Sequence, residues 1–282
     1  MDKPVAIVET VRNGGVEMDT AGTVVLTGAA GGMGKAVRSL LEERNWRVWA
    51  LDISDAGGNG FIRTDITDER SVEAAFTEIR NRSGHIDAIV HTAGIYTMDS
   101  LVEMTEEEVL RIFNVNLFGI MRVNRIFLPI LSPHSRITMV SSELAPLDPL
   151  PFTGIYAITK SAIEKYAYSL RMELQLLGHT VSVIRPGAVK TPFLGQSRKK
   201  IGEFCSKTGL YRNTSRRFLD LVNRIETANV EPERIARKVL LALESRHPRY
   251  VYNINRSPLL RLMSALPQHL QTRLIASILR NR

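Results

Sequence analysis

The chain has 282 residues, 44% of them hydrophobic, and a formal net charge of +8 at pH 7. This length allows one large α/β domain with a sizeable core and is too short for two domains of ordinary size. The single Cys205 excludes an internal disulfide and fits a reducing compartment, and no apolar run approaches the length of a membrane-spanning helix.

The N-terminus and the basic residues narrow the class of protein further. The first twenty residues carry four acidic side chains and neither an apolar core nor a basic amphipathic pattern, so we expect no targeting peptide and a cytoplasmic protein. Residues 197–217 hold seven Lys or Arg and one Glu, and residues 245–282 hold seven Arg and no acid. Neither segment alternates basic with aromatic residues, so we expect solvated faces or acidic-lipid contact rather than nucleic-acid binding.

Apolar strand-like runs alternate with longer helical patterns along the chain, which predicts βαβ units and a parallel sheet. We expect strands at residues 23–27, 47–52, 60–63, 86–91, 136–141, 181–185 and 249–253. We expect helices at residues 33–44, 68–82, 105–131, 156–177 and 231–245. Residues 1–21 are predicted to be a mobile extension of a domain that spans residues 22–255.

A glycine-rich turn follows the first predicted strand and opens the first predicted helix. It reads Thr-Gly-Ala-Ala-Gly-Gly-Met-Gly and places Gly28, Gly32 and Gly34 around Met33. A β-carbon at these glycines would hold a pyrophosphate away from the backbone N–H groups at the positive end of the helix. The strand–turn–helix context therefore predicts a dinucleotide site.

Asp52 closes the second predicted strand, eighteen residues after Gly34. A carboxylate in this position can accept both hydroxyls of the adenosine ribose and would repel a 2′-phosphate. The residue before Gly32 is Gly31, so no basic side chain offsets that repulsion there. These residues predict NAD(H) as the cofactor, with NADP(H) disfavoured.

Tyr156 and Lys160 lie four residues apart on a predicted helix, so their side chains share one face. A free phenol has a pKa of about 10. A lysine ammonium beneath it, together with the positive nicotinamide of an oxidised cofactor, favours the phenolate that alcohol oxidation needs as a base. The preceding strand ends in Ser141-Ser142, and we prefer Ser142 as the group that hydrogen-bonds the substrate oxygen. The motifs in this order predict hydride transfer between a nicotinamide and an alcohol or carbonyl.

Together these motifs resemble the classical short-chain dehydrogenase/reductase family over roughly residues 22–255. The resemblance implies a single-domain Rossmann fold, a doubly wound seven-stranded parallel sheet with helices on both faces. It implies a catalytic tetrad of Asn116, Ser142, Tyr156 and Lys160, in which Asn116 distorts its helix and orders a water that relays protons to Lys160. It implies a cofactor site without metal, made by Gly28, Gly32, Met33, Gly34, Asp52, Asp65, Ile66, Ala93, Gly94, Tyr156, Lys160, Pro186, Gly187, Val189 and Thr191.

The chain departs from the family pattern at two points. His91-Thr92-Ala93-Gly94 stands where the family usually has Asn-Asn-Ala-Gly, and we expect His91 to be structural rather than catalytic. The interval from Ser142 to Tyr156 is fourteen residues, one more than is usual, and the three prolines in that interval indicate a loop that can absorb the insertion.

Two segments lie outside the recognised motifs. Residues 192–228 are predicted to be a mobile substrate-binding lid, because long loops in compact domains are usually lids or disordered. Residues 256–282 form an apolar and basic tail, which Pro267 should split into two short helices. The tail could pack on the domain or on a subunit partner, cap the substrate pocket, or bind a lipid monolayer.

The predicted activity is interconversion of a secondary alcohol and a ketone on a bulky apolar substrate. The pocket would draw on residues 146–152, residues 192–194 and the tail, and the C-terminal region loosely resembles steroid and retinol dehydrogenases. Two alternatives stay open. One is a ketoreductase on a polyketide or acyl intermediate, which Asp52 disfavours because biosynthetic reductions generally draw on NADPH. The other is a dinucleotide-sensing regulator, which would not need the complete tetrad.

The resemblance also implies a homodimer or homotetramer formed through the predicted helices at residues 105–131 and 156–177. The apolar positions of these helices exceed what one face of the sheet could cover. Those on the first helix include Val109, Ile112, Val115, Ile120, Val123 and Phe127.

Overall fold

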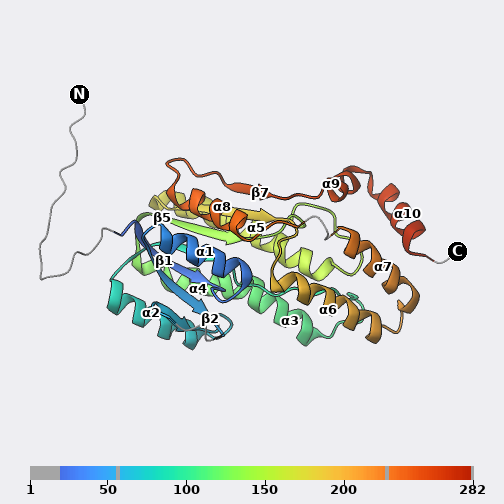
Figure 1. The fold of residues 1–282 in the computed structure, drawn as a ribbon, viewed down its shortest axis with the longest axis horizontal. Coiled ribbons are helices and arrows are strands. Elements are labelled where there is room, and N and C mark those ends of the chain that lie inside the picture. Colours follow the sequence, from blue (N-terminus) through green and yellow to red (C-terminus); the bar gives the residue numbers. More distant parts are fainter. Residues whose placement is uncertain (1–19, 55–57, 226–228, 281–282) are drawn as a thin grey trace, which may run out of the picture.

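The computed structural model describes residues 20–54, 58–225 and 229–280. Its centre is one sheet of seven parallel strands in the order β3-β2-β1-β4-β5-β6-β7 (Figure 1). The strands are β1 (Gly22–Thr27), β2 (Trp46–Asp52), β3 (Phe61–Arg63), β4 (Ile86–His91), β5 (Leu131–Val140), β6 (Thr180–Pro186) and β7 (Val251–Ile254). The strand order reverses between β1 and β4, which confirms the doubly wound fold and places a crevice at the carboxyl ends of those strands.

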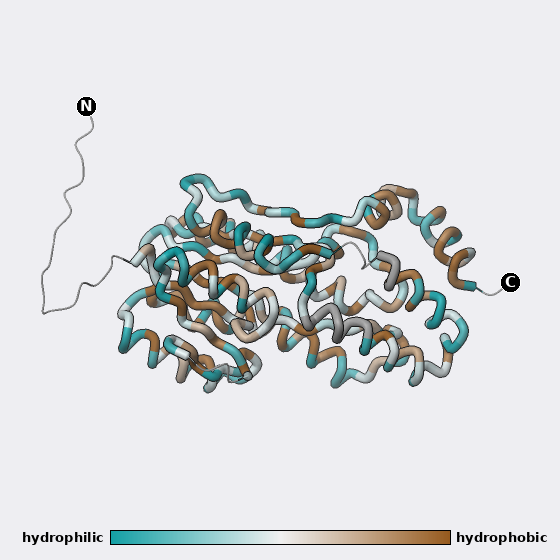
Figure 2. Tube along the Cα trace, viewed as in Figure 1, coloured by the Kyte–Doolittle hydropathy of each residue, from teal (hydrophilic) through white to brown (hydrophobic). Residues whose placement is uncertain are grey.

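Helices cover both faces of the sheet. One apolar core lies between the sheet and helices α1 and α8, and a second lies between the sheet and α2, α4 and α5 (Figure 2). The helices are α1 (Gly32–Glu43), α2 (Glu69–Ser83), α3 (Glu106–Phe113), α4 (Gly119–Phe127), α5 (Gly154–Leu174), α6 (Pro192–Lys207), α7 (Arg212–Ile225), α8 (Glu233–Glu244), α9 (Pro258–Ala265) and α10 (Gln268–Leu279). Among the residues described, no helix has the length and hydropathy needed to cross a membrane.

The single helix predicted at residues 105–131 is divided in the structure. A π-helical turn, η1 (Asn114–Phe118), separates α3 from α4, and a short 3₁₀ turn, η2 (Leu128–Ile130), follows α4. Pro129 lies in η2, and β5 begins directly after it, earlier than predicted. The apolar pattern continues through all of these pieces, so it could not show where the backbone changes its hydrogen bonding.

The segment predicted as a lid loop, residues 192–228, instead forms helices α6 and α7. Their apolar side chains fill a separate small core at one end of the sheet, where Ile201 and Phe218 are fully buried. The ring of Phe152 is the centre of this core, with ring centroids at 4.7 Å from Phe204, 5.0 Å from Tyr211 and 5.2 Å from Phe218. The described part of this segment is therefore helical rather than a loop, and its role as a mobile lid stays a prediction.

The tail forms the two helices expected from Pro267, with α9 ending at Ala265 and α10 beginning at Gln268. They lie beyond the sheet beside α7, at the C-terminal end of the chain in Figure 1. Gln271 donates to the Asp148 carboxylate at 2.7 Å, and the Asp148 N–H donates to Ser264 at 2.7 Å. The tail therefore packs on the loop between β5 and α5. The extension predicted at residues 1–21 falls outside the described residues except for its last two positions.

Candidate active site

A cleft of about 1510 Å³ opens at the carboxyl ends of the strands. It spans the point where the strand order reverses, which is where open α/β sheets bind dinucleotides. Every predicted site residue except Asn116 lines it. The residues in question are Gly28, Gly32, Met33, Gly34, Asp52, Asp65, Ile66, Ala93, Gly94, Ser142, Tyr156, Lys160, Pro186, Gly187, Val189 and Thr191.

The glycine turn between β1 and α1 has no room for side chains at two of its glycines. Gly28 has a φ of +74°, and a β-carbon there would lie 2.4 Å from the backbone nitrogen of Ala93. A β-carbon on Gly34 would lie 2.0 Å from the carbonyl oxygen of Gly28. Helix α1 begins at Gly32 with no side chain capping its first N–H groups. This cradle fits a dinucleotide pyrophosphate, which needs close approach to backbone donors at a helix N-terminus.

Asp52 lies at the end of β2, beside the glycine turn. Its carboxylate accepts from the Ala30 N–H at 2.9 Å and from the Ser54 N–H at 3.0 Å, which fixes it at the rim of the cleft. Lys35 lines the same cleft and was missed in the sequence argument, which considered only the position of Gly31. Asp52 and Lys35 thus both line the cleft, and the preference for NAD over NADP stays a prediction.

Asp65 and Ile66 line the cleft after β3. Asp65 accepts from the Thr67 N–H at 2.8 Å and from the Thr67 hydroxyl at 2.7 Å, so part of its hydrogen-bonding capacity closes its own turn. Ile66 is buried, and its side chain fills the space that a β-carbon on Gly119 would need, at 2.8 Å. Gly119 thus allows α4 to approach this edge of the site closely.

His91 and Thr92 replace the family's usual amide side chains with a different set of hydrogen bonds. His91 is buried, with Nε2 at 2.9 Å from Asn124 Oδ1 and Nδ1 at 3.4 Å from the Thr27 hydroxyl. Burial lowers the pKa of His91 to about 4, so the imidazole is neutral. The Thr92 hydroxyl donates to the Thr27 carbonyl at 2.7 Å, which joins β4 to β1. His91 lies in the core and does not line the cleft, in agreement with the structural role expected for it.

Asn116 sits within the π-helical turn and is completely buried. Its Oδ1 accepts from the Ile95 N–H at 2.8 Å, and its Nδ2 donates to the Ile95 carbonyl at 3.0 Å and to Thr159 at 3.1 Å. The helix is distorted at this residue, as the resemblance implied. Asn116 thereby fixes the chain after Gly94 against helix α5, one layer behind the cleft.

Ser142, Tyr156 and Lys160 come together at one end of the cleft. Ser142 follows β5 and hydrogen-bonds Tyr156, while the Leu144 N–H donates to the Ser142 hydroxyl at 3.2 Å. Lys160 Nζ lies 5.6 Å from the centre of the Tyr156 ring and donates to the Val140 carbonyl at 3.1 Å. The Ser141 hydroxyl instead donates to the Lys160 carbonyl at 3.3 Å, away from the phenol. This arrangement supports the choice of Ser142 over Ser141.

The electrostatics of this group show what the protein alone does to Tyr156 and Lys160. Burial raises the pKa of Tyr156 above its ordinary value, and the hydrogen bond from Ser142 only partly opposes that shift. Burial lowers the pKa of Lys160 to about 8, and the nearby Glu164 carboxylate opposes that shift. The lysine alone therefore does not make Tyr156 a base near neutral pH, because desolvation outweighs its effect.

The ends of β6 and β7 complete the cleft on the side of Ser142. A β-carbon on Gly187 would lie 2.0 Å from the Asn255 carbonyl, so only glycine fits there. Val189 pairs with Val230 in an isolated parallel bridge, and the Thr191 hydroxyl donates to the Val189 carbonyl at 3.4 Å. Pro186, Val189 and Thr191 thus stand at the cleft on a backbone held by neighbouring segments.

Comparison with known proteins agrees with this geometry. A model of the short chain dehydrogenase family matches residues 22–202. The chain belongs to the short-chain dehydrogenase family. It is 25% identical over 229 residues to 3-ketodihydrosphingosine reductase of Bacteroides thetaiotaomicron, covering 80% of this chain and 84% of the relative. It is 26% identical over 254 residues to human retinol dehydrogenase 5, covering 82% of this chain and 79% of that one.

Solved structures show the same fold. A ligand-free aldohexose dehydrogenase of Thermoplasma acidophilum superposes with a TM-score of 0.71 at 22% identity, covering 88% of this chain and 97% of that chain. The protein is thus a Rossmann-fold oxidoreductase of a family that binds NAD(P)(H). The individual roles of the site residues named above are proposals that follow from their positions.

Sequence reasoning missed several charged residues of this short-chain dehydrogenase that line the cleft, among them Glu143 and Arg256. Glu143 directly follows Ser142 and is buried, and Arg256 follows β7. A carboxylate placed next to the preferred serine was a visible signal in the sequence. The position of Arg256 was not visible, because it depends on the pairing of β7 with β6. The tail also reaches the cleft through Pro258 and Leu260.

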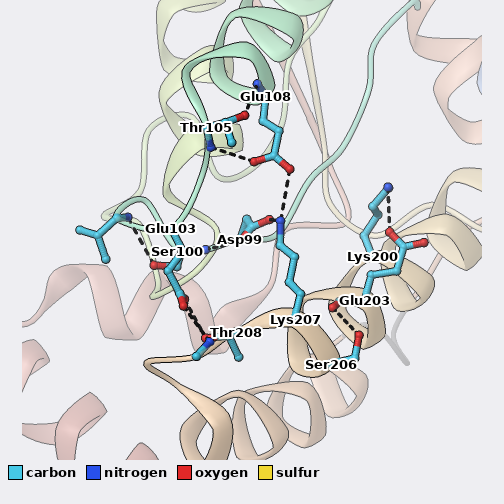
Figure 3. Close-up of polar contacts among 12 residues, drawn as sticks. Asp99, Ser100, Glu103, Thr105, Glu108, Lys200, Glu203, Ser206, Lys207 and Thr208 are labelled. Carbon is cyan, nitrogen blue, oxygen red and sulfur yellow. Dashed lines mark hydrogen bonds and ion pairs between the residues drawn. The ribbon is translucent and has the colours of Figure 1, made fainter.

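Polar contacts fasten the end of α6, part of the predicted lid of this short-chain dehydrogenase, to the segment after β4 (Figure 3). Lys207, at the end of α6, lies 2.6 Å from the buried Asp99 carboxylate and 3.2 Å from Glu108. Glu103 accepts from the Thr208 hydroxyl at 2.7 Å and from the Gly209 N–H at 2.8 Å. These hydrogen bonds raise the pKa of Lys207 and lower the pKa of Glu103, because each favours the charged form.

We expect Lys207→Met to loosen the lid. The substitution leaves the buried Asp99 carboxylate without its cation. An ion pair with one half-exposed partner is worth about 1 kcal/mol, so amide hydrogen exchange across residues 199–210 should accelerate roughly fivefold. NAD together with an alcohol substrate should restore protection. Lys200→Met is the matched control, because Lys200 pairs at 2.8 Å only with Glu203 of its own helix. Exchange unchanged by Lys207→Met would contradict this role for Lys207.

Proposed function

We propose that the protein is an NAD-dependent dehydrogenase that interconverts a secondary alcohol and a ketone on a bulky apolar substrate. The observation that carries this proposal is the meeting of Ser142, Tyr156 and Lys160 in the same cleft as the glycine turn and Asp52. A protein that only sensed a dinucleotide would need the glycine turn and Asp52, but it would not need a phenol, a hydroxyl and an ammonium at the other end of the cleft.

Each polar group of the site has a task in this reaction. NAD, when bound, supplies the acceptor for the hydride. The Ser142 hydroxyl donates a hydrogen bond to the substrate oxygen, and Tyr156 Oη takes the proton of the alcohol in oxidation or returns it in reduction. Lys160 holds the nicotinamide ribose and carries positive charge beneath the phenol. Asn116 positions Gly94 and Thr159 around Lys160 and does not touch the substrate.

The walls of the cleft near Tyr156 support an apolar substrate. They are formed by side chains from the loop after β4, the loop after β5, the lid and the tail. The apolar members of this wall are Tyr96, Met98, Leu144, Leu150, Val222 and Leu260. The pocket predicted at residues 146–152 is thus present through Leu150, whereas the side chains of residues 192–194 lie outside the described part of the structure. The names of two relatives, a 3-ketodihydrosphingosine reductase and a retinol dehydrogenase, refer to lipid substrates.

A spectrophotometric assay tests the proposal. We expect the purified protein to reduce NAD⁺ with secondary alcohols and to prefer those with larger apolar groups, because the walls offer more apolar area to bury. A preference for ketone reduction with NADPH would favour the ketoreductase alternative. Tight NAD binding without turnover of any alcohol or ketone would favour the dinucleotide-sensing alternative.

We propose a homodimer or homotetramer, in a cytoplasmic protein, formed through the helices predicted at residues 105–131 and 156–177, which correspond to α3, η1 and α4 and to α5. The residues predicted for this contact are wrong, because they lie inside the protomer. Four of them are buried, namely Ile112, Ile120, Val123 and Phe127, and Val109 and Val115 are partly buried. Ile120, Val123 and Phe127 belong to the core on the sheet, and Val109 and Ile112 pack with Ile155 and Tyr156 of α5. Val115 lines the cleft. The exposed apolar residues of these two helices and their flanks are Leu110, Phe118, Met121, Leu128, Ile158, Tyr168, Met172, Leu176 and Leu177.

We expect sedimentation of the native protein at micromolar concentration to show a dimer or larger species. Met121→Asp and Met172→Asp should shift it toward monomer, because each would bury a carboxylate in the contact. Leu210→Asp, at a leucine that is 71% exposed on the lid, is the matched control. A native protein that sediments only as a monomer would remove this proposal.

The tail contributes Leu260 to the cleft and also presents apolar side chains outward. Leu259, Leu262, Leu270, Leu274 and Ile278 are between 40% and 65% exposed, and no acidic residue lies between residues 245 and 282. We propose that this face contacts acidic lipid surfaces. Flotation with vesicles of phosphatidylcholine and phosphatidylglycerol should carry the protein, and Leu262→Asp should reduce that fraction. Flotation unaffected by either lipid charge or Leu262→Asp would contradict lipid contact.

A further inference from the structure

A charged pair interrupts the apolar wall of the cleft on the side of Ser142. Glu143 follows β5, Gly187 follows β6, and Arg256 follows β7, so three neighbouring parallel strands deliver them to one place. Glu143 and Arg256 both line the cleft. The adenosine side of the site, with Asp52, lies at β1 and β2, on the other side of the strand-order reversal. The pair therefore belongs to the part of the cleft that receives the substrate.

Glu143 is held rigidly. Its N–H donates to the Pro186 carbonyl at 2.8 Å, and its carboxylate accepts from the Ser257 N–H at 2.6 Å. Its other carboxylate oxygen lies 2.8 Å from the position that a β-carbon on Gly187 would occupy, so the absence of a side chain at Gly187 makes room for it. Burial raises the pKa of Glu143, while the Ser257 N–H and the charge of Arg256 oppose that shift. The chain thus fixes one carboxylate at a defined point of the wall.

Arg256 supplies the complementary group. Its Nε is buried and has no hydrogen-bond partner among the described residues. The positive charge of Arg256 does act on the Glu143 carboxylate, whose pKa it lowers. A buried donor without an acceptor is destabilising, and such groups in native structures call for an explanation. A few fixed polar groups in an apolar pocket commonly orient a ligand. An acceptor on the substrate would meet Arg256 at the part of its side chain that lines the cleft, because Nε itself is not accessible.

We propose that Arg256 and Glu143 form a subsite for a second hydroxyl of the substrate, distinct from the hydroxyl that is oxidised. The hydroxyl oxygen accepts from Arg256, and its hydrogen is donated to Glu143. A hydroxyl both donates and accepts, so it satisfies the two groups together. Glu143 would repel a carboxylate or phosphate, and Arg256 would repel an ammonium, so the pair selects a neutral group. The subsite rests on the proposed dehydrogenase function and specifies a diol or hydroxyketone substrate.

The test compares kcat/KM of the native protein with NAD⁺ for cyclohexanol and for the 1,2-, 1,3- and 1,4-cyclohexanediols. We expect at least one diol to exceed cyclohexanol about 10- to 100-fold, the range for a hydrogen bond to a charged group. Arg256→Met should lower the ratio of kcat/KM for that diol to kcat/KM for cyclohexanol by the same 10- to 100-fold. Glu143→Gln, which keeps the shape of the side chain, should also reduce the preference. Arg237→Met, at an exposed arginine of α8, is the control that leaves the preference intact.

Each other outcome overturns the subsite in a distinguishable way. Equal kcat/KM for cyclohexanol and all the diols shows that no second hydroxyl is recognised. An equal loss for every alcohol in both variants shows that Arg256 and Glu143 only support the fold, and thermal melting of each variant checks this. A preference for 4-hydroxycyclohexanecarboxylate that Arg256→Met abolishes shows an anion site instead. Turnover of no alcohol in the panel overturns the proposed function and the subsite with it.

Discussion

Replacing Tyr156 with phenylalanine should abolish alcohol oxidation while leaving NAD affinity nearly unchanged. The phenol exchanges a proton with the substrate oxygen, and general acid–base groups typically contribute about 10²- to 10⁴-fold to the rate. The ring itself packs against Tyr96, with centroids 4.7 Å apart, and phenylalanine preserves that contact. Steady-state kinetics with NAD⁺ and an active secondary alcohol, together with calorimetric titration of NAD⁺, measure both quantities.

Two further variants sharpen this expectation. Lys160→Ala should reduce both turnover and NAD affinity, because the ammonium serves the phenol and the ribose together. Tyr168→Phe is the matched control, since Tyr168 lies on the same helix and is 54% exposed outside the cleft. If Tyr156→Phe retained a substantial fraction of native activity, Tyr156 would not be the acid/base.

The pH dependence of oxidation follows from the same residues. The rate should rise with pH, because the deprotonated phenol is the reactive form. Burial raises the pKa of Tyr156 in the protein without cofactor, and Lys160, with a pKa of about 8, loses its charge as the pH rises further. The positive nicotinamide of bound NAD⁺ favours the phenolate, so we expect the rise in kcat/KM well below pH 10. A rise only above pH 10 would contradict this assignment.

Removing the charge of Asp52 should shrink the preference for NAD over NADP by about 5- to 150-fold. This range corresponds to a repulsion of about 1–3 kcal/mol between the carboxylate and a 2′-phosphate at partly desolvated range. Asp52→Asn is the sharper variant, because an amide oxygen can still accept from the Ala30 N–H while the charge is lost. The ratio of kcat/KM values for the two cofactors on one alcohol measures the effect.

A second variant, at Lys35, tests whether the cofactor ratio follows the sign of the charge that is removed. Lys35 lines the same cleft, and Lys35→Met should change the ratio in the opposite direction, toward NAD, because it removes a cation that would attract the phosphate. A native protein that prefers NADP would overturn the assignment of Asp52. A ratio that Asp52→Asn leaves unchanged would show that the carboxylate does not face the ribose.

Much of this fold and site could be predicted because the informative signals were local. Each strand was a short apolar run, and parallel strands bring their carboxyl ends to one edge. Residues that follow those strands, such as Asp52, Gly94 and Ser142, therefore had to meet in one cleft. The four-residue spacing of Tyr156 and Lys160 likewise fixed their relation on a helix before any tertiary contact was known.

The features that could not be predicted depend on contacts between distant segments. Phe152 organises the lid helices through Phe204 and Phe218, and nothing near Phe204 in the sequence indicates that partner. Burial by the surrounding layers raises the pKa of Tyr156, whereas Lys160 was expected to lower it. The exposed face of α4 was misassigned because apolar spacing does not tell which side of a helix meets the sheet.

The segment after β4 connects the cleft beside Lys160 with the end of α6. Near its start, Ile95 is held by Asn116 beside Gly94 and Lys160, while Asp99 and Glu103 further along hold the end of α6. A displacement of α6 therefore pulls on the same backbone that shapes the nicotinamide end of the cleft. If cofactor binding favours a closed position of α6 by some factor, that closed position must tighten cofactor binding by the same factor, because the two equilibria are linked. We therefore expect release of cofactor and movement of α6 to behave as one linked equilibrium.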